Sequence, residues 1–202
     1  MRSTLRMAFL QRLLLRALAW QLPFKSQSAK AIGKPIIIDT DIYSDVDDVG
    51  ALAVANVLHN CGIAHLKAVM VNSPSKYGSP AVSAINTYFG NGDVPIGALR
   101  PFTTDTFFDK LYLLRGEYAA KIAHHYPRTL DNSTQAFAPA KLYREILASS
   151  EDNSVTIISI GFLDNLAALL NSTADSLSDL DGWQLAQNKV RELVIMGGQY
   201  PR

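Results

Sequence analysis

The sequence predicts an α/β fold: a mainly parallel, Rossmann-like open sheet flanked by helices. Short apolar runs of strand length alternate along the chain with longer segments whose apolar residues recur at helical spacing. Strands that alternate with helices favour right-handed crossovers, which place helices on both faces of one parallel sheet. The 202 residues, of which 48% are hydrophobic and 18% charged, are enough for one large domain with a core.

The first predicted strand is a continuous apolar run, and the first predicted helix has apolar residues at helical spacing. PIIID, residues 35–39, has the pattern of a buried strand. DDVGALAVANVLHN, residues 47–60, has two aspartates at the cap positions and apolar residues at helical spacing. LKAVMVN, residues 66–72, predicts a second strand, and the SPSKYGSP that follows predicts a loop. A helix is expected after that loop, at residues 81–90.

The rest of the chain repeats this alternation. The further predicted strands are residues 94–98, 155–161 and 189–198, and the further predicted helices are residues 104–125, 140–150 and 162–172. In an open parallel sheet, ligands bind outside the carboxyl ends of the strands. Asp39 and Asp41 end the first strand. Asn72 ends the second strand, Gly161 the fourth and Gly197-Gly198 the fifth, so we expect these strand ends to line one rim of the sheet.

The N-terminal part of the chain has a composition of its own. Up to Lys34 there is no Asp or Glu, but there are seven Arg and Lys residues. Ala29-Lys30-Ala31 fits the A-x-A form of a signal-peptidase site, and two N-x-S/T sequons further along favour secretion. Four arginines on one side of a helix suit a mitochondrial presequence equally well. We predict a targeting or disordered leader at 1–33, a domain at 34–202, and a secreted or secretory-pathway protein, with mitochondrial and cytoplasmic locations as alternatives.

Composition argues against several classes of partner. The formal net charge is +1 and no basic stripe with interleaved aromatic residues occurs, so we expect no nucleic-acid partner. Cys61 is the only cysteine, which excludes an intrachain disulfide and a cluster of thiolate metal ligands. No apolar run approaches the roughly 20 residues of a membrane helix, so we expect no stable membrane insertion.

The stretch IIIDTDIYSDVDDVGAL gathers an unusual amount of negative charge behind a buried strand. Five aspartates fall within ten residues: Asp39, Asp41, Asp45, Asp47 and Asp48. Carboxylates a few ångströms apart repel, and burial raises their pKa values unless a cation neutralises them. Calcium and magnesium, which prefer oxygen ligands, are the natural candidates. Helix capping by Asp47, with the other carboxylates solvated, is the simpler alternative, but it explains one aspartate of the five.

The same stretch resembles the N-terminal signature of the inosine–uridine-preferring nucleoside hydrolase family. That signature is a strand ending in D-x-D, a short loop, and D-D opening a helix. The resemblance extends through VNSPSKYGSPAVSAINTYFG and VTIISIGFLDNLAALL and ends at VRELVIMGGQYP. It covers nearly everything from Lys34 to Pro201. The aspartate motif is quite specific, and the other blocks, each weak alone, occur in the right order.

The resemblance implies a calcium site. Asp41 matches the metal ligand that also activates water, which makes it the expected catalytic residue. Asp48 matches a second metal ligand. The backbone carbonyl of Ile160 matches the oxygen that the family gives to its calcium.

The resemblance also implies contacts to the substrate. Asp47 matches the carboxylate that holds ribose hydroxyls, and Asn72 lies near the place of a sugar-binding asparagine. Asp39 matches the first aspartate of the motif and is expected to give structural support to the loop. Asp45 lies in a loop that is longer than in the best-known members, and the resemblance gives it no role.

The implied activity is calcium-dependent hydrolysis of the N-glycosidic bond of purine or pyrimidine ribonucleosides, giving ribose and free base. The partner would be a small-molecule nucleoside, with a homo-oligomer as a further option. The family continues past the M-G-G strand with a Glu and an Asn that contact the sugar, and later with a His-Asp pair. Since the sequence ends at Arg202, we expect a C-terminally truncated member with an incomplete fold, whose activity as an isolated chain is a matter for assay.

Two other interpretations of the aspartate loop remain open at this point. A haloacid-dehalogenase-like magnesium phosphohydrolase also ends its first strand with D-x-D, and there Asp39 would be the nucleophile and Asp41 the general acid. A non-catalytic ribose- and calcium-binding remnant would keep the loop without turnover. Metal choice separates the first alternative from a nucleoside hydrolase, and calcium binding without ribose release would indicate the second.

Overall fold

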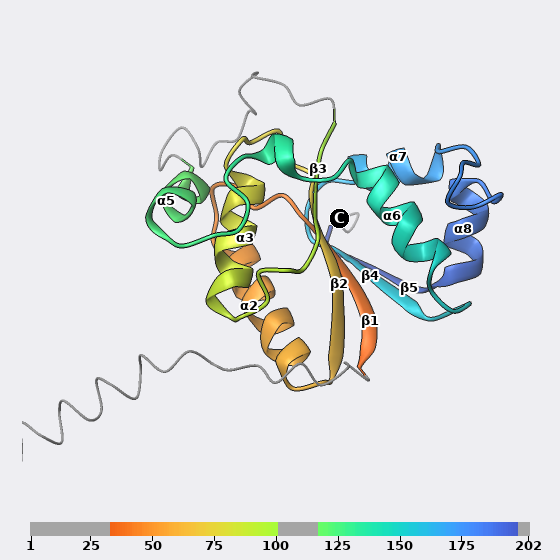
Figure 1. Cartoon of the computed structure of the whole chain (residues 1–202), viewed down its shortest axis with the longest axis horizontal. Coiled ribbons are helices and arrows are strands. Elements are labelled where there is room, and N and C mark those ends of the chain that lie inside the picture. Colours follow the sequence, from red (N-terminus) through yellow and green to blue (C-terminus); the bar gives the residue numbers. More distant parts are fainter. Residues whose placement is uncertain (1–32, 101–116, 198–202) are drawn as a thin grey trace, which may run out of the picture.

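In a computed structural model, which describes residues 33–100 and 117–197, the chain forms one parallel sheet with helices on both faces (Figure 1). The strands are β1 (Lys34–Thr40), β2 (Ala64–Val71), β3 (Ile96–Ala98), β4 (Val155–Ser159) and β5 (Val190–Ile195). Their order in the sheet is β3-β2-β1-β4-β5, and all four pairings are parallel. This confirms the predicted fold class and makes β1 the central strand.

The helices divide into two groups, one on each face of the sheet (Figure 1). The first group is α2 (Asp47–Asn60), α3 (Gly78–Tyr88) and α5 (Tyr118–His125), and the second is α6 (Pro139–Ala148), α7 (Asp164–Leu170) and α8 (Gly182–Lys189). A short 3-10 helix, η1 (Ser133–Gln135), lies between α5 and α6 in the chain. Among the described helices, we find none long and apolar enough to span a bilayer.

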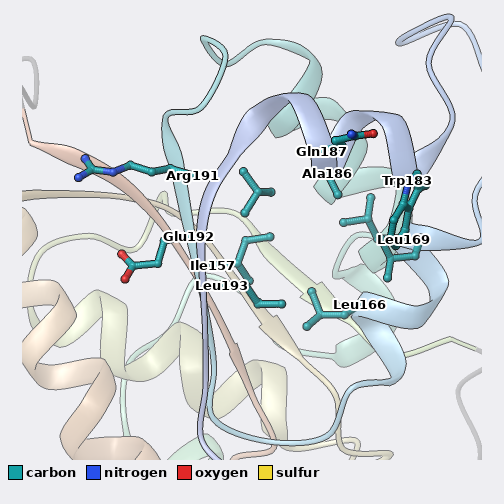
Figure 2. A pocket seen from close by; sticks show the side chains of 11 residues that line it. Ile157, Leu166, Leu169, Trp183, Ala186, Gln187, Arg191, Glu192 and Leu193 are labelled. Atoms are coloured by element: carbon teal, nitrogen blue, oxygen red, sulfur yellow. The ribbon is translucent and has the colours of Figure 1, made fainter.

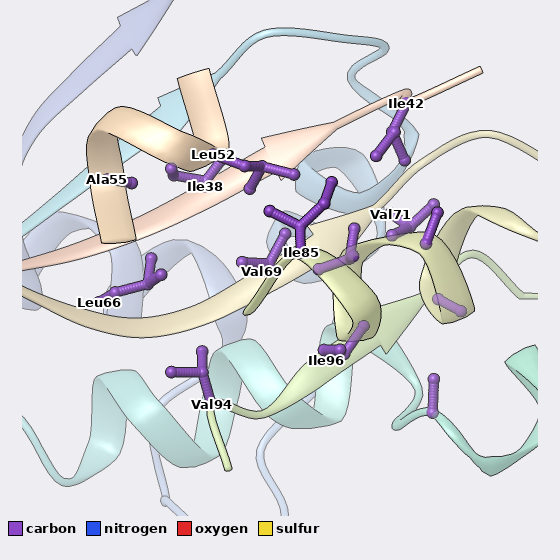
Figure 3. Close-up of a cluster of buried hydrophobic side chains, with 14 of the residues drawn as sticks. Ile38, Ile42, Leu52, Ala55, Leu66, Val69, Val71, Ile85, Val94 and Ile96 are labelled. Carbon is purple, nitrogen blue, oxygen red and sulfur yellow. The ribbon is translucent and has the colours of Figure 1, made fainter. Parts of the chain in front are cut away.

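The continuous apolar run of β1 is explained by burial on both faces. Ile36 and Ile38 point into the core under α2 and α3, together with Leu52 and Ile85 of those helices (Figure 3). Ile37 points to the opposite side. This alternation is what a strand with two covered faces requires, because successive side chains leave a strand in opposite directions.

The second core lies between the sheet and the other three helices. Ile37 and Met70 meet Leu147 of α6, Leu169 of α7 and Leu185 of α8 there. All five side chains are at most 1% exposed. The two cores fix β1 and its neighbours from both sides, and so they fix where the carboxyl end of β1 lies.

Some element boundaries differ from the sequence-based expectation. Helix α3 begins at Gly78, three residues before the predicted start, and places Pro80 in its first turn, where a missing backbone N–H costs nothing. Helix α8 was not predicted, although Asp181 and Gln184 form a capping box at its start. The predicted leader, up to residue 32, and the first part of the predicted helix 104–125 lie outside the described residues.

Strand β5 is an edge strand that is exposed on both of its faces. It pairs with β4, and its residues Leu193, Val194 and Ile195 are 44–48% exposed. On one face it borders a groove of about 440 Å³, whose walls come from β4, β5, α7 and α8 and include Ile157 and Trp183 (Figure 2). An exposed apolar edge strand of this kind is a site for self-association.

Two isoleucines in parallel strands provide a matched test of this difference in burial. Ile37 in β1 is fully buried, whereas Ile195 in β5 is 48% exposed. We expect Ile37→Ala to lower the free energy of unfolding by about 2–5 kcal/mol because it leaves a cavity, and Ile195→Ala to lower it by about 1 kcal/mol or less. Denaturant unfolding of both variants beside wild type measures the two losses. Equal losses would show that β5 is covered in solution.

Candidate active site

The aspartate loop, residues 41–48, leaves the carboxyl end of β1 and includes the first two residues of α2. Ile42 is fully buried in the core under α2 and α3, and its backbone N–H donates to Thr40 Oγ1 at 3.2 Å. This anchor leaves Asp41 half-buried and Asp45 exposed at the rim of the sheet. Ile42 therefore anchors the loop, while Asp41 and Asp45 lie at the rim.

Asp48 is a buried carboxylate at the start of α2, with 3% of its surface exposed. The Thr40 hydroxyl donates a hydrogen bond to Asp48 Oδ1, and the Asp41 and Asp48 side chains are themselves within hydrogen-bonding contact. The expectation that the two aspartates cap the helix is wrong. The N-cap is Val46, and no side chain makes a cap hydrogen bond.

The loop concentrates negative charge in a partly buried space. Burial, with further contributions from Asp41 and Asp47, raises the pKa of Asp48 to about 7. Burial is also the main cause that raises the pKa of Asp41, and Asp45 and Asp47 add to it. These carboxyl groups do not readily ionise together at neutral pH without a compensating positive charge. The site is electrostatically suited to a cation.

The structure brings together a set of oxygen ligands that could hold a metal ion. One carboxylate oxygen from each of Asp45, Asp47 and Asp48 lies within 4.8 Å of the others. An all-oxygen set of this kind suits a hard divalent ion. The predicted metal ligands were Asp41 and Asp48, so the two sets share Asp48, which also contacts Asp41. The sequence indicated no role for Asp45, because no local pattern predicts that the loop brings its carboxylate close to those of Asp47 and Asp48.

The turn after β4 packs directly against the aspartate loop. Ile160, whose carbonyl was the third predicted metal ligand, donates its backbone N–H to the Asp39 carbonyl at 2.7 Å. A Cβ added to Gly161 would lie 2.5 Å from the Asp41 nitrogen and 2.7 Å from Asn72 Oδ1. Only glycine permits this approach. The rim expected from the strand ends is thus formed by Asp41, Asn72 and the Ile160-Gly161 turn.

Asp39 is the centre of a buried polar network beneath this rim. It is fully buried, and its Oδ1 accepts hydrogen bonds from Asn72 Nδ2 at 2.7 Å and Asn165 Nδ2 at 3.0 Å. Its Oδ2 accepts from the Tyr143 hydroxyl at 2.7 Å. Burial raises the pKa of Asp39 to about 6, and the three hydrogen bonds oppose that rise. These contacts are those of a residue that supports the loop.

Asn72 connects the network to the turn after β4. Besides its bond to Asp39, Nδ2 donates to the Phe162 carbonyl at 2.9 Å, and Oδ1 accepts from the Phe162 N–H at 3.1 Å. The side chain is 1% exposed. These bonds position the turn, and the expected contact of Asn72 with a sugar stays a prediction.

Two members of the network were not predicted as site residues. Asn165 lies in the first turn of α7, where no side chain makes a cap hydrogen bond, and it donates to Asp39 instead. Its place just after the carboxyl end of β4 was the available signal. Tyr143 lies in the middle of α6, where its spacing indicated an ordinary core residue.

The groove beside β5 is separate from these residues. None of the loop aspartates, Asp39 or Asn72 is among the residues that line it. Its lining is mainly apolar, whereas the chemistry of the chain gathers at the carboxyl ends of β1, β2 and β4. Charge and strand topology, rather than the volume of a hollow, locate the candidate active site.

Comparisons with known proteins concern the family pattern and the fold. The sequence pattern of the family described as inosine-uridine preferring nucleoside hydrolase matches residues 36–202. A purine-preferring ribonucleoside hydrolase from Gardnerella vaginalis has a similar fold, with 18% identity, a TM-score of 0.57, and coverage of 82% of this chain and 49% of that one. A plant nucleoside hydrolase, PpNRh1, matches with 21% identity, a TM-score of 0.52, and coverage of 82% and 48%.

A third solved structure widens the comparison. The type III effector protein XopQ, complexed with adenosine diphosphate ribose, matches with 18% identity, a TM-score of 0.61, and coverage of 84% of this chain and 44% of that one. Among curated proteins, none matches the chain significantly. The chain thus spans about half the length of these three solved chains, and the likenesses concern the fold.

The raised pKa values predict a pH-dependent stability of the metal-free chain. Asp39 and Asp48 have folded-state pKa values of about 6 and about 7 against an ordinary 3.8, so the folded chain binds protons more tightly than the unfolded chain. Their contribution to stability is fully present below about pH 4 and is lost as the pH rises through about 6 to 7. Thermal melts in chelator should show this fall, and added calcium should raise Tm more at pH 7.5 than at pH 5.

Asp48→Asn is the matched control, because it removes the charge and keeps an Oδ1 acceptor for Thr40. In chelator at pH 7.5 it should melt above wild type, with a smaller response to calcium. A wild-type Tm that rises steadily from pH 4 to pH 7 in chelator would contradict the assignment of these carboxyl groups as electrostatically strained.

Tyr143→Phe tests the network under the rim. It removes one donor from the buried Asp39 carboxyl group without changing the volume of the core, so it should lower the free energy of unfolding by about 1–3 kcal/mol. Tyr88→Phe is the control, because Tyr88 is 78% exposed and its substitution should change stability by no more than about 0.5 kcal/mol. Equal effects in denaturant unfolding would argue that Asp39 does not depend on this bond.

Proposed function

Because the chain belongs to the inosine-uridine preferring nucleoside hydrolase family, we propose that it acts in the calcium-dependent hydrolysis of ribonucleosides to ribose and free base. The observation that carries this proposal is the grouping of Asp45, Asp47 and Asp48 after the central strand, with Asp41 in contact with Asp48. The pKa values of Asp41 and Asp48 are raised. Both the family and the charge of the site support a divalent cation there.

Asp48 is the central cation ligand of the proposal. It is buried, it contacts Asp41, and its oxygen lies near those of Asp45 and Asp47. Asp41, Asp48 and the carbonyl of Ile160 would hold the ion, with Asp45 as an additional ligand that the loop makes available. When bound, calcium supplies the positive charge that these carboxylates lack and lowers the pKa of a nearby water molecule.

Asp41 acts as the general base in this proposal. It is half-buried at the rim, and burial raises its pKa, which strengthens it as a proton acceptor. It takes a proton from the water that attacks the anomeric carbon of the sugar. Asp47, which is exposed beside Asp48, holds ribose hydroxyls and so orients the sugar for attack.

The proposed partner is a small nucleoside, and inosine and uridine are the first substrates to assay because the family description names both. The near-neutral net charge of +1 gives no reason to propose a nucleic-acid partner. We further propose a location in the secretory pathway, supported by the composition of the first 33 residues.

The phosphohydrolase interpretation is disfavoured by the environment of Asp39. A nucleophile has to reach its substrate, yet Asp39 is fully buried and both of its oxygens accept hydrogen bonds from protein groups. The non-catalytic interpretation keeps the same site without turnover, so the assay below distinguishes it directly.

The test is ribose release from inosine and uridine by the 202-residue chain, with calcium and with chelator. We expect release only with calcium. Asp41→Asn should lower kcat by about 10²- to 10⁴-fold because the general base is lost. Asp93→Asn, at an exposed aspartate far along the chain from the loop, should leave kcat unchanged.

Calcium titration calorimetry completes the design. Wild type should bind one calcium ion, and Asp48→Asn should bind it far more weakly. Binding without ribose release would support a calcium-binding protein without catalysis. A wild-type chain that shows no heat of binding would overturn the cation site itself.

A further inference from the structure

The hydroxyl of Tyr118 is buried and unpaired. Tyr118 opens α5, and among the residues that the structure describes its hydroxyl has no hydrogen-bond partner. A buried polar group without a partner costs about 1–3 kcal/mol, and phenylalanine would fill the same space without that cost. An unsatisfied hydroxyl in a folded chain therefore calls for an explanation, and a bound ligand is one.

The start of α5 is fixed close to the rim of the candidate active site. The Ser75 hydroxyl donates a hydrogen bond to Glu117 Oε1, and Ser75 lies three residues after Asn72. The ring of Tyr118 packs against the core that contains Ile42, the neighbour of Asp41. Helix α5 thus brings Tyr118 to the side of the sheet on which the aspartate loop lies.

The carboxylates of the aspartate loop act on this hydroxyl. Burial is the main cause that raises the pKa of Tyr118, followed by Asp48 and then by Asp45, Asp47 and Asp41. The negative charge of these aspartates favours the protonated form of the hydroxyl. The raised pKa keeps the hydroxyl protonated, so it is available as a neutral hydrogen-bond donor.

A ligand group between this donor and the carboxylates must meet two requirements. It has to accept a hydrogen bond from the tyrosine hydroxyl and donate one to a carboxylate. A phosphate is repelled by the carboxylates, and an ammonium group cannot accept a hydrogen bond. A sugar hydroxyl does both.

We propose that Tyr118 is a substrate-binding residue whose hydroxyl donates a hydrogen bond to a ribose hydroxyl held by the aspartate loop. The assignment rests on the proposed function and adds a residue that lies in none of the motifs of the sequence. It makes Tyr118 a determinant of selectivity, because a deoxynucleoside that lacks the contacted hydroxyl cannot use it. The unpaired hydroxyl is then satisfied when substrate binds.

The test compares wild type and Tyr118→Phe on inosine, 2′-deoxyinosine and 3′-deoxyinosine. Tyr118→Phe should lower kcat/KM for inosine about 10-fold through the loss of one hydrogen bond. For the one deoxynucleoside that lacks the contacted hydroxyl, the two proteins should have equal kcat/KM. Tyr88→Phe, at an exposed tyrosine of α3, should behave as wild type on all three substrates.

Stability provides a readout that does not depend on turnover. Tyr118→Phe should melt at or above the wild-type Tm because no internal hydrogen bond is lost, whereas Tyr143→Phe should melt below it. A loss of Tm equal to that of Tyr143→Phe would overturn the proposal, because the hydroxyl would then have a partner within the protein.

The kinetic outcomes separate this inference from the proposed function. Unchanged kcat/KM for inosine in Tyr118→Phe, with an active wild type, overturns the assignment and leaves the function standing. An equal loss on all three nucleosides also overturns it, because the hydroxyl would then act on the protein rather than on a sugar hydroxyl. A wild type that releases no ribose from inosine or uridine overturns the function, and the sugar contact falls with it.

Discussion

The buried carboxyl group of Asp39 is the interaction on which the rim depends. It lies near the carboxyl end of β1. It accepts hydrogen bonds from Asn72, the residue after β2, from Tyr143 of α6 and from Asn165 of α7. These partners come from the end of one neighbouring strand and from two helices of one face, so a single residue connects the fold to the site. The arrangement is costly for a carboxyl group, whose pKa rises to about 6. It is stable because each oxygen is satisfied by a neutral donor.

The carboxyl groups of the aspartate loop, unlike that of Asp39, lie beside other carboxyl groups. Asp41 and Asp48 are partly or fully buried, and their like-charged side chains are neighbours of one another. A chain selected for stability alone would not place them so, and a local conflict of this kind marks a functional site. The same consideration applies to Tyr118, whose hydroxyl lacks a partner within the described chain. In the proposals made above, one ligand set, a cation and a sugar, would relieve both conflicts.

The sequence predicted what depends on local pattern and on strand topology. The alternation of apolar runs gave the parallel sheet, helix α2 has the expected bounds, and the rule that ligands bind at carboxyl ends brought Asp41, Asn72 and Gly161 together. It could not predict contacts between residues far apart in the chain. Tyr143 bonds to Asp39 across 104 positions, and in sequence it is indistinguishable from a core tyrosine. Asn165 looks like a cap because cap residues and rim residues are of the same type.

The candidate site is built around β1, the central strand of the sheet, and not around the edge strand β5. The site residues come from the end of β1, from the loop and helix start that follow it, and from the loops after β2 and β4. Strand β1 has both β2 and β4 as hydrogen-bonded neighbours. Strand β5 contributes none of the described site residues, and its Leu193, Val194 and Ile195 are exposed. Strand β5 is separated from β1 and the aspartate loop by β4. The geometry that gathers the carboxylates is set at the centre of the sheet, where both faces and both neighbours of the strand are already in place.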